Sequence, residues 1–278
     1  MPELPEVETV RAGAEPHLVG RRLDLVELAR HDLRWPIPVE ALVAMQGRRC
    51  LAVMRRSKFL LLCFGGAGRP LALVHLGMTG RLCVEPRRRA EPPPWRKHEH
   101  WRMHFGTRLV RYVDPRRFGA LGAADAATLP LHPWLRDLGQ EPLEPGFDGD
   151  FLHRISRRKK CSIKALLMNA RLVVGIGNIY ASESCWRAAV RPRRAAGSLS
   201  RGECQVLATA VVEVLRAAIA AGGTSFRDFV GVGEDAGYFA RELDVYERMG
   251  EPCHRCGALI RRTVDQGRSS YWCAGCQR

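Results

Sequence analysis

The sequence predicts an α+β protein in which a helix and a β-rich sandwich or barrel precede a helical region that ends in a small cysteine-containing module. Three observations support this fold class. Short strand-like runs punctuated by Gly and Pro fill the first half, an amphipathic helical pattern dominates the second, and two Cys-x2-Cys pairs close the chain. With 278 residues, 46% of them hydrophobic, the chain is long enough for two packed domains and a small module.

The N-terminal segment is predicted to form a helix, because the apolar residues Val7, Val10, Ala14 and Leu18 recur at three- to four-residue spacing. Gly20 is expected to end this helix. Strand-like runs come next, at residues 23–28, 50–54, 59–64, 71–76, 101–105 and 109–113. Many short strands with turn residues between them favour a sandwich or barrel over alternating βαβ units. Residues 85–97 contain three consecutive prolines and predict an exposed hairpin loop.

A change in composition marks the domain boundary, since prolines and glycines recur over residues 129–150 and the periodicity fades. We therefore expect an N-terminal domain at 2–130, a linker at 131–150, a helical domain at 151–240 and a C-terminal module at 241–278. Ser200-Arg201-Gly202-Glu203 fits a capping box that opens a long helix, and Gly222-Gly223 ends it. The apolar stripe of this helix is expected at Val206, Leu207, Ala210, Val211, Val214, Leu215, Ala218 and Ile219.

The C-terminal cysteines have the spacing of a structural zinc site. Cys253 and Cys256 form one Cys-x2-Cys pair, and Cys273 and Cys276 form the other, sixteen residues later. Four thiolates complete a tetrahedron around one Zn²⁺ and leave no open position, so the site is structural rather than catalytic. Two disulfides are the alternative, which an intracellular setting disfavours. The six other cysteines are scattered singly and are expected to pack as small buried hydrophobes.

The charge balance favours an anionic partner. The chain has 44 Lys and Arg against 29 Asp and Glu, a formal net charge of +15 and a pI near 9.9. Nucleic acid is the usual partner of such a surface, although an Arg-rich proteome would produce the same balance. Arg261, Arg262 and Arg268 make the zinc module itself basic. No apolar run is long enough to span a membrane and no signal-peptide pattern is present, so a soluble intracellular protein is expected.

The first residues carry a candidate nucleophile. If Met1 is removed, Pro2 presents a secondary amine, and an α-amino group titrates at about 7.7–8.0 whereas Lys titrates at about 10.4. Such an amine can attack a sugar C1′ and form a Schiff base, with Glu3 beside it as acid or base. The alternative is that Pro and Glu simply begin a helix. Residues 1–8 alone leave both interpretations open.

Four internal segments join the N-terminus and the cysteine module in one ordered pattern. They are Arg55-Arg56-Ser57-Lys58-Phe59-Leu60, His75-Leu76-Gly77-Met78-Thr79-Gly80-Arg81, Asp114-Pro115-Arg116-Arg117-Phe118-Gly119 and Gly175-Ile176-Gly177-Asn178-Ile179-Tyr180-Ala181-Ser182-Glu183. In this order and spacing the chain resembles the formamidopyrimidine-DNA glycosylase family of bacterial 8-oxoguanine repair enzymes, over essentially its whole length. The resemblance implies an N-terminal β-sandwich flanked by helices, then a helix-two-turn-helix domain with a zinc finger, and DNA bound between them.

The resemblance also assigns roles to particular residues. It implies Pro2 as nucleophile, Glu3 as proton carrier, Lys58, Asn178 and Arg268 as phosphate ligands at the active site, and His75 near the same backbone. Met78, Arg116 and Phe118 would fill the gap that a flipped nucleotide leaves. Glu6 would support the active-site region, and residues 224–239 would close over the damaged base. Core packing is the plain alternative for Met78 and Phe118, an ordinary surface lysine for Lys58, and a capped turn for Gly175–Asn178.

The implied activity is removal of oxidised purines followed by strand cleavage through β,δ-elimination, with one structural zinc ion and no redox cofactor. The implied partner is damaged duplex DNA, bound by a monomer in the bacterial cytoplasm near the nucleoid. Three alternatives stay open: an endonuclease VIII-type enzyme for oxidised pyrimidines, a catalytically silent DNA binder, and a zinc protein resembling a transcription factor.

The chain departs from the usual family pattern at two places. Asn169 stands where Asp is common, and residues 185–194 are unusually rich in Arg. His98-Glu99-His100 looks superficially like a metal site, but strand alternation without further ligands predicts a polar strand edge instead.

Overall fold

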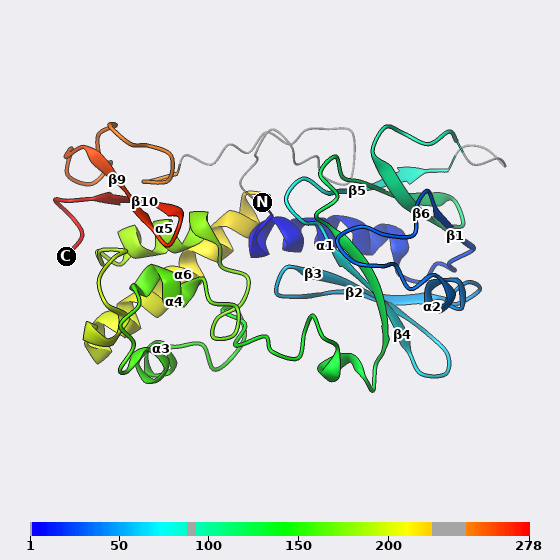
Figure 1. The fold of residues 1–278 in the computed structure, drawn as a ribbon, viewed down its shortest axis with the longest axis horizontal. Helices are drawn as coiled ribbons and strands as arrows, with labels where there is room; N and C mark the ends of the chain where they lie inside the picture. Colours follow the sequence, from blue (N-terminus) through cyan, green and yellow to red (C-terminus); the bar gives the residue numbers. More distant parts are fainter. Residues whose placement is uncertain (1, 88–92, 224–242) are drawn as a thin grey trace. The chain divides into compact units, whose positions relative to one another are not determined.

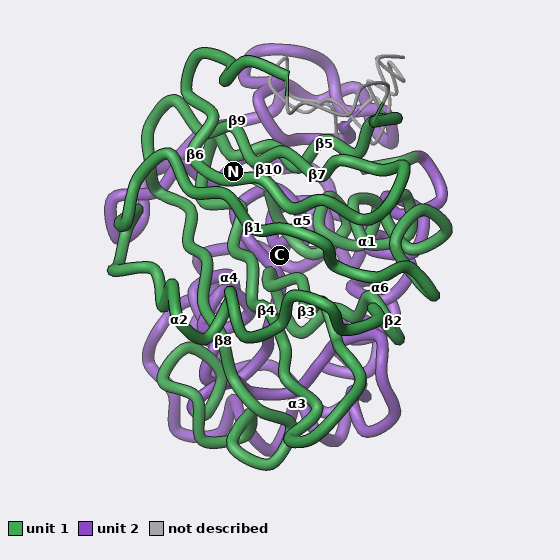
Figure 2. The backbone as a smooth tube through the Cα atoms, turned by 90° about the vertical axis from the view of Figure 1, so that its right-hand side faces the viewer, with its two compact units in different colours: residues 1–136, 222–240 green, residues 137–221, 241–278 purple. Residues whose placement is uncertain are grey.

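The structure is a computed structural model that describes residues 2–87, 93–223 and 243–278. The chain folds into two compact units, one of residues 1–136 and 222–240 and one of residues 137–221 and 241–278 (Figure 2). The domain boundaries expected at 130, 150 and 240 stay predictions, and the expected closing loop at 224–239 lies outside the described residues. Among the described helices, none combines the length and the apolar character needed to cross a membrane.

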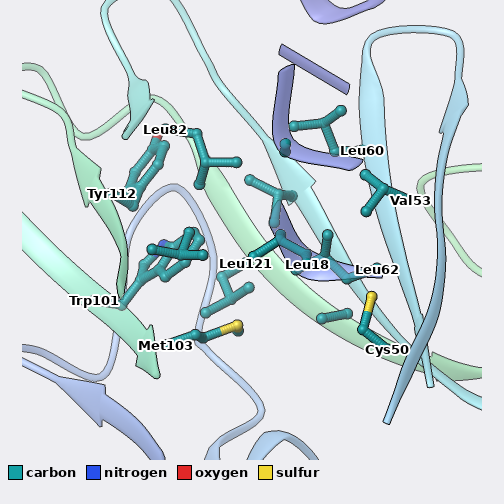
Figure 3. Packing of buried hydrophobic residues seen from close by; sticks show 14 of the residues in the cluster. Leu18, Cys50, Val53, Leu60, Leu62, Leu82, Trp101, Met103, Tyr112 and Leu121 are labelled. Atoms are coloured by element: carbon teal, nitrogen blue, oxygen red, sulfur yellow. The ribbon is translucent and has the colours of Figure 1, made fainter. Parts of the chain in front are cut away.

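The N-terminal unit contains two four-stranded antiparallel sheets (Figure 1). The first has the order β1 (Leu25–Leu28), β6 (Glu99–Phe105), β7 (Arg108–Val113) and β5 (Arg81–Pro86). The second has the order β2 (Cys50–Arg56), β3 (Phe59–Phe64), β4 (Pro70–His75) and β8 (Ala120–Asp125). Side chains from both sheets enter one hydrophobic cluster, in which Trp101, Tyr112 and Leu62 are fully buried (Figure 3). The predicted sandwich is therefore confirmed.

Helix α1 (Leu4–Leu18) begins directly after Glu3 and packs against β2, β3 and β5. Its apolar face, including Val7, Val10 and Leu18, is buried in the sandwich core, as the periodicity predicts. Burial of each such side chain contributes about 1.5–3 kcal/mol, so this face holds the start of the chain in place. The short helix α2 (Val39–Val43), which packs against β1 and β8, has no clear sequence signal.

Residues 87 and 93–97 lie outside any strand and 94–97 are exposed, as expected for a loop, but the prediction that residues 85–97 form a hairpin is wrong. Glu85 and Pro86 belong to β5, and β5 does not pair with β6, because β7 lies between the two strands. Strand β8 is another element that the sequence did not indicate. Its Ala- and Gly-rich residues have low β-propensity, and they form a strand because they pair with β4 along its whole length.

The prediction of a polar strand edge at residues 98–100 is also wrong. Glu99 and His100 are buried, at 4% and 7% exposure, and His98 lies before the strand at φ 63°. Glu99 Oε2 accepts a hydrogen bond from Arg111 Nη1 at 2.6 Å, and His100 Nε2 lies 2.7 Å from the carbonyl oxygen of Asp114. Glu99 and His100 thus each have a polar partner inside the protein, while Glu99 Oε1 is buried without a hydrogen-bond partner among the described residues.

The C-terminal unit is mainly helical. It contains α3 (Gly149–Ser156), α4 (Ile163–Leu167), α5 (Asn178–Arg187), α6 (Arg201–Ala220) and the hairpin of β9 (Ile260–Asp265) and β10 (Arg268–Cys273). The capping box is confirmed, because Ser200 Oγ accepts from the Glu203 N–H and Glu203 Oε2 accepts from the Ser200 N–H. Helix α6 packs against α3 and α5. Val206, expected in its buried stripe, is 55% exposed, while Cys204 and Ala208 are buried instead.

Candidate functional site

The start of the chain is held by α1. Pro2 is half-buried, and Glu3 is the N-cap residue of the helix with only 2% of its surface exposed. The Glu3 N–H donates to Glu6 Oε2 at 2.7 Å, and Glu6 is itself 3% exposed. Gly223, at φ +84°, lies against Glu6, since a Cβ there would be 3.3 Å from the Glu6 side chain. The helix therefore holds Glu3, and Pro2 directly before it in the chain, in a fixed and partly enclosed position.

Lys58 lies in the two-residue turn between β2 and β3, after Ser57 at φ 55°. Arg55 supports this turn, because its Nη1 donates to the Ser57 carbonyl oxygen at 3.0 Å while its Nε pairs with Glu8 of α1 at 2.9 Å. The ion pair links the Lys58 turn to the helix that carries Pro2. Sequence reasoning did not single out Arg55 or Glu8 for this role, although Arg55 stands in the motif itself.

His75, at the end of β4, is a neutral hydrogen-bond donor. Its Nδ1 accepts the Gly77 N–H at 3.0 Å, so in the neutral ring the hydrogen is on Nε2. Burial and the charges of Lys58 and Arg34 lower the pKa of His75 to about 4, against the opposing effect of Asp114. A neutral Nε2–H next to a lysine is suited to an anionic ligand such as a phosphate.

The lowered pKa of His75 predicts a loss of stability in mild acid. In the unfolded chain His75 gains a proton below about pH 6.5, while in the folded protein it resists protonation down to about pH 4. We expect the free energy of unfolding to fall by about 1–2 kcal/mol from this group between pH 7 and pH 5. His75→Gln should remove that part of the pH dependence in denaturant titrations, and His31→Gln, at an exposed position, should not. Equal pH dependence in wild type and His75→Gln would contradict the assignment.

Met78, Arg116 and Phe118 lie on two neighbouring loops, β4–β5 and β7–β8. Met78 is 40% exposed and Phe118 43% exposed, which excludes the alternative that they are core residues. The guanidinium carbon of Arg116 lies 4.6 Å from the centroid of the Phe118 ring. Two exposed apolar side chains and a stacked guanidinium form a surface that can enter a base stack.

Asp114 holds the two loops together and was not predicted as a site residue. The residue is completely buried, and its carboxylate accepts hydrogen bonds from Thr79 Oγ1 at 2.6 Å, the Gly119 N–H at 2.9 Å and the Tyr112 hydroxyl at 3.2 Å. Burial raises the pKa of Tyr112 far above its usual range, so its hydroxyl stays a donor. One carboxylate thus fixes both the loop of Met78 and the loop of Phe118.

Gly119→Ala is expected to disturb this arrangement. A Cβ at Gly119 would lie 1.6 Å from the Tyr112 hydroxyl oxygen and 2.7 Å from the His75 carbonyl oxygen, so the backbone has to shift. We expect a destabilisation of about 1–3 kcal/mol, measured by denaturant unfolding, together with weaker binding to damaged duplexes. Gly65→Ala is the matched control in the same unit, because its Cβ would meet only Leu51 at an ordinary 3.5 Å. A Gly119→Ala protein as stable as Gly65→Ala would refute the role given to this close approach.

Asn178 is the first residue of α5, after Gly175 at φ +80° and the N-cap Gly177. Its Nδ2 lies 3.4 Å from the Tyr246 hydroxyl, and its buried Oδ1 has no hydrogen-bond partner in the described part of the chain. Glu183 positions Tyr246, since its carboxylate accepts the N–H groups of residues 244, 245 and 246 at 2.9–3.0 Å. Burial raises the pKa of Glu183, and these three donors oppose that shift.

Arg268 is exposed at the start of β10 and lines a hollow of about 320 Å³ together with Lys164, Asn169 and Asp265. The Lys164 ammonium is buried and donates to the Ser269 carbonyl oxygen at 2.6 Å and to Ser270 Oγ at 2.9 Å.

The predicted site residues divide between the two units. The C-terminal unit contains Arg268, Asn178 and the cysteine cluster, and the N-terminal unit contains Pro2, Glu3, Lys58, His75, Met78, Arg116 and Phe118.

The four C-terminal cysteines converge as the spacing predicts. Their Sγ atoms all lie within 4.8 Å of one another, with Cys256 and Cys273 at 3.4 Å and Cys253 and Cys276 at 3.9 Å. Sulfurs about 2.3 Å from a tetrahedral zinc ion are about 3.8 Å apart, so the cluster fits Zn²⁺. Burial opposes ionisation of Cys253, but the Arg255 N–H and the Trp186 indole N–H lower its pKa to about 6 and favour the thiolate. All ten cysteines are free thiols, which argues against the disulfide alternative.

Comparison with known proteins identifies the family. Residues 1–121 match the formamidopyrimidine-DNA glycosylase N-terminal domain, residues 138–230 match the H2TH domain of the same enzymes, and residues 250–278 match the zinc finger found in FPG and IleRS. The predicted helix-two-turn-helix domain and zinc cofactor are thereby confirmed.

Curated relatives named formamidopyrimidine-DNA glycosylase, from Thiobacillus denitrificans and Stenotrophomonas maltophilia, are 48% and 47% identical over 100% of this chain and of their own length. Among solved structures, the Lactococcus lactis Fpg in complex with DNA containing an abasic site superposes with a TM-score of 0.88 at 31% identity, covering 99% of both chains. The L. lactis enzyme with DNA containing N7-benzyl-Fapy-dG gives 0.88 at 31% identity over both full chains. The protein belongs to the formamidopyrimidine-DNA glycosylase family.

Proposed function

We propose that this protein excises oxidised purines, 8-oxoguanine and formamidopyrimidines, from duplex DNA and then cleaves the strand at the resulting abasic site. The observation that carries the proposal is the start of the chain, where Pro2 adjoins a buried carboxylic acid on a helix that the core and the Glu3–Glu6 hydrogen bond hold in place. The full-length match to enzymes named for this lesion class supports the choice of substrate.

The proposed reaction begins after Met1 is removed. The Pro2 nitrogen forms a bond to C1′ of the damaged nucleotide, the bond from C1′ to the base breaks, and the base leaves with a proton. Glu3 supplies and takes up protons as the sugar ring opens and an iminium forms. Loss of a proton from C2′ then expels the 3′ phosphate, and a further elimination expels the 5′ phosphate. Pro2 is released when water hydrolyses the iminium.

The remaining residues bind and shape the DNA in this proposal. Lys58, Asn178 and Arg268 hold the phosphates around the damaged nucleotide, and the Nε2–H of His75 donates to the same backbone. Met78 and Phe118 occupy the space left by the flipped nucleotide, and Arg116 hydrogen-bonds the unpaired base opposite. The exposure of Met78 and Phe118 and the neutral state of His75 support these roles.

The partner is damaged double-stranded DNA, bound by one protein monomer. The net charge of +15 supports such binding and predicts a strong dependence on salt concentration. We place the protein in the bacterial cytoplasm, associated with the nucleoid through DNA.

The test compares duplexes that carry 8-oxoguanine opposite cytosine, an oxidised pyrimidine, or no lesion, in single-turnover assays with borohydride present. We expect excision and a trapped adduct with 8-oxoguanine, and an adduct peptide that begins at Pro2. Faster excision of the oxidised pyrimidine would favour an endonuclease VIII-type enzyme. Binding without excision by protein that mass spectrometry shows to lack Met1 would leave only a damaged-DNA binder.

A further inference from the structure

A second basic pocket lies in the C-terminal unit and plays no part in the reaction proposed above. Its volume is about 430 Å³, and its lining residues are Arg191, Arg193, Arg194, Arg278, Thr263 and Trp272. Four of these six residues are arginines and none is acidic. The electrostatic character of the pocket therefore selects for a strongly anionic group.

The pocket is held in shape by contacts of its own. The guanidinium carbon of Arg191 lies 4.5 Å from the centroid of the Trp272 ring, and that of Arg261 lies 5.8 Å from it. Trp272 is only 8% exposed, so the ring is a fixed platform. The segment that carries Arg191 is tied to the chain end, because the Arg191 N–H donates to the Arg278 carbonyl oxygen at 2.8 Å and Gln277 Nε2 donates to the Val190 carbonyl oxygen at 2.8 Å.

Several donors in this pocket are not used by the protein. Arg194 is paired with Glu203, but no carboxylate pairs with Arg191 or Arg193 within the part of the chain that the structure describes. Two buried polar atoms of lining residues, Trp272 Nε1 and Thr263 Oγ1, also have no hydrogen-bond partner among the described residues. Those two atoms are closed off from solvent, so the donors open to a ligand that supplies acceptors are the guanidinium groups of Arg191 and Arg193, which are exposed in the pocket.

We propose that this pocket binds a phosphodiester of the DNA backbone, at a distance from the phosphates next to the lesion. The inference rests on the proposed function, in which Arg268 contacts DNA. Arg268 and Trp272 lie on the same face of β10, since their side chains are four residues apart in an alternating strand. Four residues of strand span about 13 Å, a separation that two phosphates of one DNA strand a few nucleotides apart can match. One continuous strand can therefore reach both positions.

The test measures how salt weakens binding to a duplex with a non-cleavable abasic-site analogue. Loss of one phosphate contact reduces the slope of log K against log salt by about 0.9, which corresponds to about fivefold weaker binding at 0.15 M salt. We expect this change in the double variant Arg191→Gln/Arg193→Gln and recovery in Arg191→Lys/Arg193→Lys. The control Arg22→Gln/Arg216→Gln removes the same charge from exposed sites and should leave the slope unchanged. Equal slopes for the double variant and the control would overturn the proposal.

A second arm identifies the anion. Single methylphosphonate linkages, which are neutral, are placed one at a time along the duplex. The wild-type protein should bind more weakly when the neutral linkage is at one position several nucleotides from the lesion. The affinity of Arg191→Gln/Arg193→Gln should not fall any further with the linkage at that position. If the double variant instead loses only its affinity for free inorganic phosphate, the DNA assignment is wrong. The single-turnover excision rate at saturating protein should be unchanged by the variant. If the wild-type protein excises no base, the proposed function is refuted. The salt dependence of DNA binding still tests the proposed phosphate pocket in that case.

Discussion

Pro2→Gly is expected to lower the rate of base excision by about 10²- to 10⁴-fold, the range for loss of one well-placed catalytic group. The glycine variant keeps an N-terminal amine of similar basicity, but it is a primary amine. Its imine must gain a proton before it can withdraw electrons from the sugar, whereas the iminium of a proline carries its positive charge at every pH. Single-turnover excision of 8-oxoguanine and borohydride trapping both measure the difference.

The matched control is Pro16→Gly, the same exchange at an exposed position of α1. Because proline is less favourable than glycine inside a helix, this variant should fold and excise bases at the wild-type rate. Binding to an abasic-site duplex should change little in either variant, since Pro2 acts in the chemical step. A Pro2→Gly protein with wild-type excision, or an adduct that maps outside the N-terminal peptide, would show that another nucleophile performs the reaction.

The local elements of the fold follow from the sequence, whereas the long-range pairings do not. The spacing of Val7, Val10, Ala14 and Leu18 predicts α1, and the run at 59–64 predicts β3 with its observed bounds. Strand β8 has no such signal, because its residues are weak strand formers that depend on β4. The order β1-β6-β7-β5 is likewise set by pairing between distant segments, which is why the expected hairpin between β5 and β6 does not exist.

In the candidate site, too, the sequence predicts the residues that are present but not their long-range arrangement. Motif order indicates which residue types are present, but it cannot say whether Met78 and Phe118 are buried, since apolar residues serve both cores and DNA wedges. Their exposure is a property of two loops that Asp114 joins, and a carboxylate that accepts hydrogen bonds from residues 79, 112 and 119 is visible only in three dimensions. The role of the Arg-rich stretch at 185–194 is also hidden in the sequence, because the stacking of Arg191 on Trp272 is visible only in the structure.

Removal of zinc is expected to unfold the β9–β10 hairpin and to abolish tight DNA binding. The binding free energy of a structural zinc ion, about 10–16 kcal/mol, is largely folding free energy of the segment that it binds. Cys253 and Cys273 are also members of a small hydrophobic cluster with Trp186, Val245 and Ile260, so loss of the metal opens that cluster as well. Chelation or Cys253→Ala should therefore release the hairpin from α5, and Arg268 at the start of β10 loses its fixed position.

Hydrogen exchange, zinc content and DNA affinity together separate this effect from general unfolding. Amides of β9 and β10 should lose protection on zinc removal, while those of β3 and β4, whose core lies within the N-terminal unit, should keep it. Cys161→Ala is the matched control, because Cys161 is in the same unit and outside the four-cysteine cluster. It should retain one zinc ion and wild-type affinity. Protection of β9 and β10 that survives chelation would mean that the packing around Trp186 suffices to hold the hairpin and that zinc is not its main stabiliser.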